Sequence, residues 1–310
     1  MLALIDADIL VFRCGFAAER KVWHLAWNPI DSAPDNEGKA WGDMKEFEYK
    51  KEALNHLDKV VPGKHSRQEG EDYSLWPEVD LQPVSYALQN VKTSVNKALE
   101  ACHCNEFDAK LFLSGKTNFR DRIAVTKPYK GSRDRTHRPT HEKAIREYML
   151  KNYDCQEAED EEADDLLGIW QTKVGPEDSV IISLDKDLDQ IPGFKYNFMH
   201  DINYCVSDTE ARIAFYTQLL TGDSTDDIVG LPGIGPGKAK KALHGLTTEE
   251  ELLAECCRMY QIHSGKEDWQ TYMREMGQLL WIRRVPGEMW DFTYEEGFEL
   301  DETELTMYAD

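Results

Sequence analysis

Four groups of acidic residues stand where elements of secondary structure are expected to begin or end. Asp6 follows the apolar run Leu2–Ile5, and Asp185 and Asp187 follow the apolar run 179–184. Two further groups, 161–165 and 223–227, open segments with a helical pattern. Because ligands of open α/β sheets bind beyond the carboxyl ends of the strands, we expect these groups to converge at one site.

Carboxylates that converge without a counter-ion repel one another and raise one another's pKa. A divalent cation removes this repulsion, and a set of oxygen ligands without His or Cys favours Mg²⁺ or Mn²⁺. Asp185 and Asp187 would point the same way if the strand continued through them, and Glu162 and Asp165 share one face of a helix. Each group alone has a structural explanation, as a helix start or a turn. The four together predict a metal site.

A glycine-rich turn at 230–241 is followed at once by lysines. Glycines let a backbone approach closely and expose N–H groups, and a helix N-terminus attracts phosphate. Two prolines exclude a dinucleotide-binding turn, and the lack of a Lys-Ser/Thr pair excludes a nucleotide-triphosphate loop. The pattern predicts a hairpin between helices that binds a nucleic-acid backbone through Gly233, Gly235, Gly237, Lys238 and Lys241.

A second basic segment, 118–138, interleaves cations with aromatic residues, a combination that suits single-stranded nucleic acid. The whole chain carries a net charge of −22, which argues against uniform binding to phosphate. The charge is uneven, however: residues 110–151 hold twelve Lys or Arg against four Asp or Glu, whereas residues 285–310 hold nine acids and no Lys or Arg. We therefore expect nucleic acid to bind at local basic patches.

The elements that must position these residues alternate along the chain. Strands are expected at 2–5, 110–113, 153–156, 179–184 and 196–199, and helices at 9–19, 84–99, 140–150, 161–173 and 208–221. Alternation of this kind predicts a parallel sheet with helices on both faces. Residues 21–80 are rich in turn formers and predict an irregular insertion with one helix near 47–60, while 208–284 predicts helices only.

Taken together, these motifs resemble the 5′-nuclease superfamily, which includes flap endonucleases, the 5′-nuclease domain of bacterial DNA polymerase I and the 5′–3′ exonucleases of tailed phages. The resemblance covers about 1–20 and 107–245 and is carried by Asp6, Glu162-Ala163-Asp164-Asp165, Asp185-x-Asp187, Gly222-Asp223-x-x-Asp226, Gly233-Ile234-Gly235 with Lys238, and Pro128-Tyr129-Lys130-Gly131-x-Arg133.

The resemblance implies an α/β fold in which a PIN-like parallel sheet has flanking helices and a helical arch. It also implies an all-helical helix-three-turn-helix module that binds DNA. The expected boundaries are 1–207 for the catalytic domain, with the insertion at about 21–80 and the arch at about 115–140, then 208–285 for the module and 286–310 for an acidic tail.

The function implied is a metal-dependent 5′–3′ exonuclease or flap endonuclease that hydrolyses DNA at 5′ ends, in phage DNA replication or degradation. RNA–DNA hybrids, as in primer removal, are a further expected substrate. Two Mg²⁺ or Mn²⁺ ions would be held by Asp6, Glu162, Asp164, Asp165 and Asp185 and by Asp187, Asp223 and Asp226. Lys130 and Arg120 would stabilise the phosphate beside the catalytic Asp6 and Asp185. Arg120, Tyr129, Lys130, Arg133 and the hairpin would bind DNA, with K⁺ at Gly233–Gly235.

One departure from the family pattern leaves alternatives open. Relatives carry an Asp after the second strand, where this chain has Ser114-Gly115. Either one ion has fewer ligands or Asp8 substitutes. The rival functions are a PIN-type ribonuclease, which would lack the hairpin and the basic segment, and a catalytically inactive DNA-structure-binding protein, which Ser114 favours. The seven cysteines and the absence of a run of about 18 apolar residues predict a cytoplasmic protein, in the host cytoplasm if it is phage-encoded.

Overall fold

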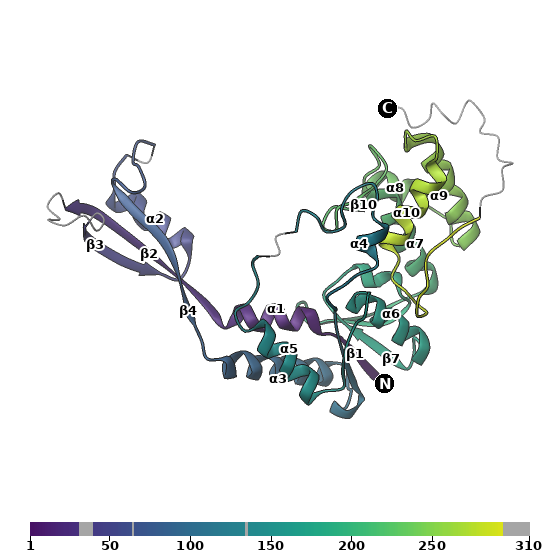
Figure 1. Ribbon diagram of the computed structural model, residues 1–310, viewed down its shortest axis with the longest axis horizontal. Coiled ribbons are helices and arrows are strands. Elements are labelled where there is room, and N and C mark those ends of the chain that lie inside the picture. The colour runs from purple at the N-terminus through teal and green to yellow at the C-terminus, as the bar shows by residue number, and fades with distance from the viewer. Residues whose placement is uncertain (31–39, 64, 134–135, 294–310) are drawn as a thin grey trace. The chain divides into compact units, whose positions relative to one another are not determined.

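The computed structural model describes residues 1–30, 40–63, 65–133 and 136–293. The chain divides into two compact units. The first contains residues 1–11, 92–138 and 146 onward, and the second contains residues 12–91 and 139–145 (Figure 1). The expected boundary at 207 therefore falls inside the first unit, and the division follows the insertion instead.

The first unit is built on a six-stranded sheet in the order β6-β5-β1-β7-β8-β9. Its central strands β1 and β7 are buried apolar runs, as expected where helices cover both faces of a parallel sheet. The first five strands of this order are parallel, which confirms the predicted parallel sheet, while β9 pairs antiparallel to β8 at the edge. The strands are β1 (Leu2–Asp6), β5 (Ala109–Leu113), β6 (Cys155–Glu157), β7 (Ser179–Ile182), β8 (Gly193–Asn197) and β9 (Ile202–Val206).

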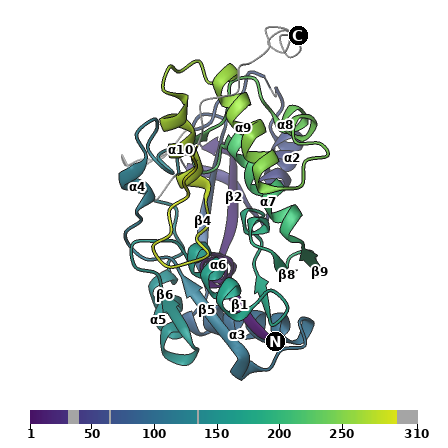
Figure 2. The same cartoon turned by 90° about the vertical axis from the view of Figure 1, so that its right-hand side faces the viewer.

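Helices α1 (Ala7–Ala17), α3 (Val84–Ala101), α5 (Glu142–Asn152) and α6 (Ala163–Val174) follow the predicted alternation. Short 3₁₀ turns, η1 (Glu106–Asp108) and η2 (Asp187–Gln190), precede β5 and β8. Helix α6 packs across β1, β5 and β7 through a core that includes Leu4, Leu167 and Ile181 (Figure 2). This packing holds the start of α6 against the carboxyl end of β1.

The C-terminal part of the first unit is a bundle of α7 (Asp208–Thr221), α8 (Pro236–Ala242), α9 (Glu249–His263) and α10 (Trp269–Leu280). Ser207 and Thr248 each begin a helix through a capping box. The predicted all-helical pattern needs one correction, because β10 (Gly222–Asp223) and β11 (Ile228–Val229) form a small ribbon after α7. Trp290 and Phe292 are buried in the bundle core, so residues 286–293 belong to the bundle; the tail beyond 293 lies outside the described residues.

The segment expected to form a helical arch is mostly loop. Over the described parts of 115–140, the only helix is α4 (Arg120–Ile123). The helical arch and the helix-three-turn-helix geometry therefore remain predictions.

The second unit corrects the interpretation of 21–80 as irregular. The unit contains an antiparallel sheet with β2 in the centre, formed by β2 (Glu19–Ile30), β3 (Ala40–Phe47) and β4 (Tyr73–Leu81). Helix α2 (Lys50–Val60) confirms the expected helix. Helix α2 buries Ala53 and Leu57, and His56 contacts the rings of Trp27 and Phe47. Most residues of β4 stay exposed, so no apolar alternation marked it as a strand.

Candidate functional site

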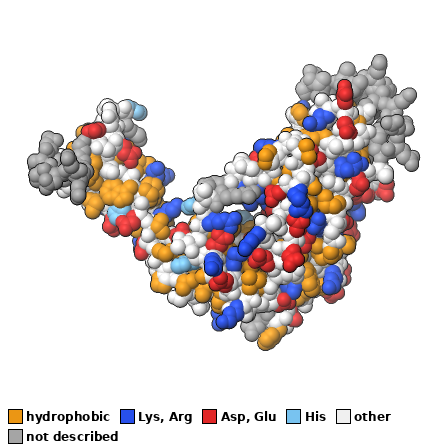
Figure 3. Space-filling view, in the orientation of Figure 1, with side chains coloured by type: hydrophobic (Ala, Val, Ile, Leu, Met, Phe, Trp, Pro, Cys, Tyr) orange, Lys and Arg blue, Asp and Glu red, His pale blue; other side chains and the backbone are white. Residues whose placement is uncertain are grey.

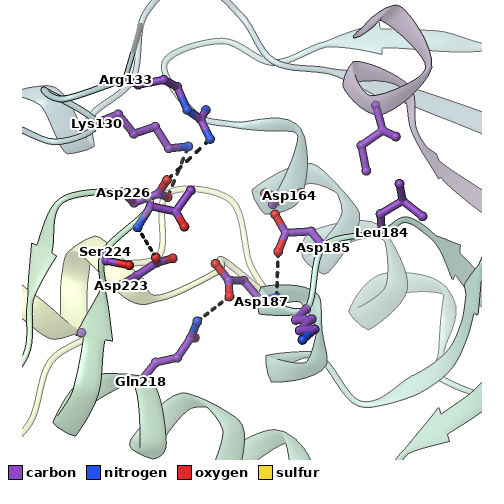
Figure 4. Close-up of a pocket in the computed structure, with 14 residues that line it drawn as sticks. Lys130, Arg133, Asp164, Leu184, Asp185, Asp187, Gln218, Asp223, Ser224 and Asp226 are labelled. Atoms are coloured by element: carbon purple, nitrogen blue, oxygen red, sulfur yellow. Dashed lines mark hydrogen bonds and ion pairs between the residues drawn. The ribbon is translucent and has the colours of Figure 1, made fainter. Parts of the chain in front are cut away.

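The carboxyl ends of β1 and β7, the start of α6 and the β10–β11 ribbon surround one open cleft of about 620 Å³. Figure 4 shows acidic side chains from these separate segments facing it, with two cations at one side. The predicted site residues that line the cleft are Asp164, Asp185, Asp187, Asp223 and Asp226, with Lys130 and Arg133.

Asp6, the last residue of β1, is buried behind this lining. Its Oδ1 accepts from the N–H groups of Asp8 at 3.2 Å and Ile9 at 3.5 Å, and its Oδ2 accepts from the hydroxyl of Ser183 at 2.8 Å. Burial, followed by the charges of Asp8 and Asp185, raises the pKa of Asp6 to about 7.

Asp185 and Asp187 differ from expectation in their local structure, because β7 ends at Ile182 and they lie in the turn that leads into η2. The N–H of Asp187 donates to Oδ1 of Asp185 at 2.9 Å, and Nε2 of Gln218 donates to Asp187. Burial and the charges of Asp185 and Asp223 raise the pKa of Asp187 to about 7. The turn, rather than a strand, brings the two carboxylates together.

The start of α6 supplies Glu162 and Asp164. Burial, then the charges of Asp185 and Asp6, raises the pKa of Asp164 well above its ordinary value. Lys130 is the nearest cation: its Nζ lies 2.6 Å from Oε1 of Glu162 and 3.4 Å from Oδ2 of Asp226. Most of the cleft carboxylates are thus close to other acids, and Lys130 offsets only part of that charge.

No family model matches this chain. A segment of 122 residues is 31% identical to DNA polymerase I of Rhizobium leguminosarum, and it covers 36% of this chain. The chain resembles the 5′-nuclease superfamily. The match spans only 12% of the length of that polymerase, so the activity of the whole polymerase is not assigned to this chain.

Solved structures of bacteriophage T5 proteins are more distant matches to this 5′-nuclease-like chain. The T5 5′-exonuclease with bound zinc has a TM-score of 0.47 and 15% identity, and the match covers 90% of this chain and 86% of that one. A T5 protein co-crystallized with metal ions has a TM-score of 0.44 and 18% identity, over 62% of this chain and 79% of that one. Because both TM-scores lie below 0.5, we take no functional role from these structures.

Two residues of the 5′-nuclease-like motifs do not reach the cleft. The guanidinium of Arg120 binds both oxygens of Asp165, at 2.6 and 2.9 Å, and also donates to the carbonyls of Leu279 and Trp281. Both side chains are buried and bonded to each other, so neither lines the cleft; the phosphate contact of Arg120 and the metal ligation by Asp165 stay predictions that this arrangement does not favour. The Arg120 guanidinium holds the pKa of Asp165 below its ordinary value despite burial.

Tyr129 is also buried, at 5% exposure, so its ring is covered and its predicted role in binding nucleic acid stays a prediction. Its hydroxyl lies 2.8 Å from Oε2 of Glu162 and 3.0 Å from Oδ2 of Asp226, and it connects two acidic segments. Arg133 is exposed at the rim, 3.8 Å from Asp226.

The predicted phosphate-binding hairpin lies between β11 and α8, outside the cleft lining. Gly233 has a φ of 73°, which favours glycine, and Gly235 is the N-cap residue of α8. Gly233, Gly235, Gly237, Lys238 and Lys241 are all exposed. Binding of DNA or K⁺ here remains a prediction.

Sequence reasoning missed three polar residues that hold the acids in place: Ser183, Gln218 and Arg146. Arg146 lies 3.2 Å from Oδ1 of Asp8 and donates to the carbonyl of Ser114 at 2.6 Å, and the N–H of Ser114 donates to Oδ2 of Asp8. Asp8 is thus engaged by these partners. A serine two positions before Asp185 was the one local signal available; the others depend on tertiary contacts.

Proposed function

We propose that this chain is a metal-dependent 5′-nuclease that hydrolyses phosphodiester bonds at the 5′ ends or flaps of DNA. The observation that carries the proposal is the gathering of five aspartates from three separate segments around one cleft, with Lys130 and Arg133 beside them. The likeness of part of the chain to a DNA polymerase I supports the same reading.

The donor set fits divalent ions of the Mg²⁺ or Mn²⁺ kind. It consists of carboxylates whose pKa values are raised first by burial and then by one another's charge, and a bound cation would favour their ionised form. Over the part of the chain that the structure describes, no three His, Cys, Asp or Glu side chains are close enough to enclose one ion as they stand. Binding would therefore require the carboxylates to turn further into the cleft.

We assign the ligands in two groups. Asp6, Glu162, Asp164 and Asp185 would hold one ion, and Asp187, Asp223 and Asp226 would hold the other. When bound, such ions activate water and stabilise the leaving oxygen of a phosphodiester. The residues of this chain would orient the phosphate: Lys130 would turn from Glu162 towards it, and Arg133 would bind the strand at the rim. The exposed hairpin lysines would bind the duplex, sequence-independently.

A cleavage assay on a 5′-labelled duplex and on a 5′-flap substrate, with Mg²⁺ or with chelator, tests the proposal. We expect Mg²⁺-dependent release of 5′ products by the wild-type chain. We expect none from Asp185→Asn, although that variant should retain DNA binding in a gel-shift assay. Asp189→Asn is the matched control, because Asp189 pairs with Tyr204 outside the cleft lining and the variant should keep most activity.

Two outcomes would contradict the nuclease assignment. Near-wild-type turnover by Asp185→Asn would remove the metal role of the cleft. Absence of cleavage by the wild-type chain, with retained binding to flaps, would identify the inactive DNA-structure-binding alternative, for which Ser114 is the supporting feature. Cleavage of matched RNA but not of DNA would identify the ribonuclease alternative.

A further inference from the structure

The carboxyl ends of β1 and β7 place a serine beside the buried aspartate of the site. The two strands are parallel neighbours with Ile5 opposite Ile182, so the residues that follow, Asp6 and Ser183, lie side by side. Ser183 is 8% exposed and its hydroxyl donates to Oδ2 of Asp6 at 2.8 Å. The same oxygen accepts from the N–H of Asp185 at 3.0 Å.

The chemistry of these groups fixes the direction of both hydrogen bonds. A backbone N–H can only donate, so the oxygen of Ser183 accepts from Asp185; the single hydroxyl proton of Ser183 points at Asp6 when that carboxylate is ionised, as it is in a metal ligand. The path then continues from Asp185, whose Oδ1 accepts from the N–H of Asp187 at 2.9 Å. One serine hydroxyl thus joins a path of hydrogen bonds through three proposed metal ligands.

Asp6 depends on this hydroxyl for one of its two oxygens. Its Oδ1 is held by the first turn of α1, through the N–H groups of Asp8 and Ile9. Among the residues that the structure describes, Ser183 donates the hydrogen bond that Oδ2 accepts. Removing the hydroxyl would leave a buried carboxylate oxygen of Asp6 and the backbone N–H of Asp185 without these partners, and both would rearrange.

We infer that Ser183 is a positioning residue, whose hydroxyl fixes Asp6 and Asp185 in the relative orientation that a shared divalent ion needs. This inference rests on the proposed function. Uncharged residues that orient metal ligands commonly change metal affinity or activity by about 10- to 100-fold when removed. A small hydroxyl suits this position because it orients two acidic residues without adding another charge.

The strand β7 offers a matched control at its opposite end. Ser179, its first residue, is fully buried and its hydroxyl donates to the carbonyl of Gly175 at 2.8 Å. Ser179→Ala removes the same group from another buried serine, at the end of the strand away from the carboxylates. A loss of stability alone would affect both variants, whereas a loss of ligand orientation would affect only Ser183→Ala.

The test is direct titration of Mn²⁺, with free ion measured by electron paramagnetic resonance, on the full-length chain and its Ser183→Ala, Ser183→Thr and Ser179→Ala variants. Urea unfolding of each variant reports stability separately. We expect Ser183→Ala to weaken Mn²⁺ binding by about tenfold or more. Ser183→Thr, which keeps the hydroxyl, should bind within about threefold of wild type, and Ser179→Ala should bind as wild type does.

Unchanged Mn²⁺ affinity in Ser183→Ala, or an equal loss in Ser179→Ala, would overturn the inference while leaving the proposed function intact. The failure of the proposed function looks different: the wild-type chain itself would then bind no Mn²⁺ and cleave no DNA. If Ser183→Ala did not fold, the folded Ser183→Thr variant would decide. Weak Mn²⁺ binding by Ser183→Thr would overturn the inference, and Mn²⁺ binding at the wild-type level would support the inference.

Discussion

Arg120 and Asp165 form a buried ion pair whose polar atoms are satisfied from several directions. Asp165 also accepts from the N–H groups of Glu162 and Arg283, which lie on opposite sides of it in the sequence. Breaking a buried pair by removing one charge is far more costly than its net contribution suggests, because the other charge remains buried. This pair therefore holds α4, α6 and the chain after α10 together.

We predict that Asp165→Asn lowers the free energy of unfolding by about 3–5 kcal/mol at pH 7, measured by urea denaturation. Asp160→Asn is the control, since Asp160 pairs with Arg122 at the surface and should have little effect. Because the folded pKa of Asp165 is depressed, its contribution is present above the ordinary carboxyl pKa of 3.8 and is lost as pH falls below it. Equal stability of the two variants would contradict the structural role.

Lys130 faces the cleft and is the cation best placed to meet a phosphate there. It has a φ of 50°, and its N–H donates to the carbonyl of Asp226 at 2.9 Å, so the backbone as well as the side chain is tied to the site. We predict that Lys130→Ala slows single-turnover cleavage by about 100-fold or more, because a charge that stabilises the reacting phosphate is lost. Lys186→Ala removes an exposed lysine from the same cleft lining and should slow single-turnover cleavage less than threefold. This corresponds to a rise of about 0.6 kcal/mol or less in the activation free energy.

An unchanged single-turnover rate in Lys130→Ala would defeat its role at the phosphate.

The cleft aspartates and Lys130 were predictable because their spacing and positions at element ends are local properties of the sequence. The burial of Arg120, Tyr129 and Asp165 was not predictable. Arg120 meets Asp165 across 45 residues and the carbonyl of Trp281 across 161, so their burial depends on packing that no motif records.

At the scale of elements, β8 contains a lysine that the proposed function does not use. Lys195 is 3% exposed, and its Nζ donates to Oε1 of Gln171 at 3.2 Å. Burial lowers its pKa to about 7, with only partial compensation from Asp189. Between about pH 7 and 10.5 the folded state has therefore lost this proton, whereas the unfolded state still carries it. The free energy of unfolding consequently rises with pH over that window.

We predict that Lys195→Met, which keeps the length of the side chain, raises the free energy of unfolding at pH 6 by on the order of 2 kcal/mol. The gain should shrink towards pH 10, where the wild-type lysine is neutral in the folded state. Lys116→Met changes an exposed lysine and serves as the control. Destabilisation by Lys195→Met at pH 6 would show that the ammonium is better accommodated than its burial indicates.

Sequence patterns predicted elements of the first unit better than those of the second. Residues 2–5 and 180–182 are apolar throughout, because both faces of β1 and β7 are covered. In contrast, β9 and β4 are edge strands with mostly exposed side chains, which removes the alternation that marks a strand. In the antiparallel sheet of the insertion, β2 pairs with β4 across more than 40 residues of the chain.

At the scale of the molecule, charge is organised locally. Figure 3 shows acidic and basic side chains intermixed over the face that it displays, although the chain has a net charge of −22. A third of the basic residues, twelve of 36, fall within 110–151. Since exposed charges are screened beyond about 8 Å at physiological salt, such local groups can attract phosphate on an acidic protein.

The insertion is built as a separable element. Its strands and α2 pack on one another, and the chain enters and leaves it at one place, where the N–H of Gln82 donates to the carbonyl of Ala18 at 2.8 Å. Beyond this point Glu19 pairs with Leu81 as the first step of the β2–β4 ladder. Because the two backbones are already adjacent, a two-residue link is long enough to close the gap.

We therefore predict that replacing residues 19–81 with Gly-Gly yields a folded chain. Its cooperative thermal unfolding should persist, and Mn²⁺ affinity should stay within about threefold of the full-length value, roughly 0.6 kcal/mol. The Glu19 carboxylate accepts a hydrogen bond from the N–H of Thr140 at 2.5 Å, and Thr140→Pro in the full-length chain is the control for the loss of this contact. If the shortened chain lacked cooperative unfolding, the insertion would be part of the core. If the shortened chain folded but lost Mn²⁺ binding, while Thr140→Pro kept Mn²⁺ binding, the insertion would act on the metal site from outside the residues that line the cleft.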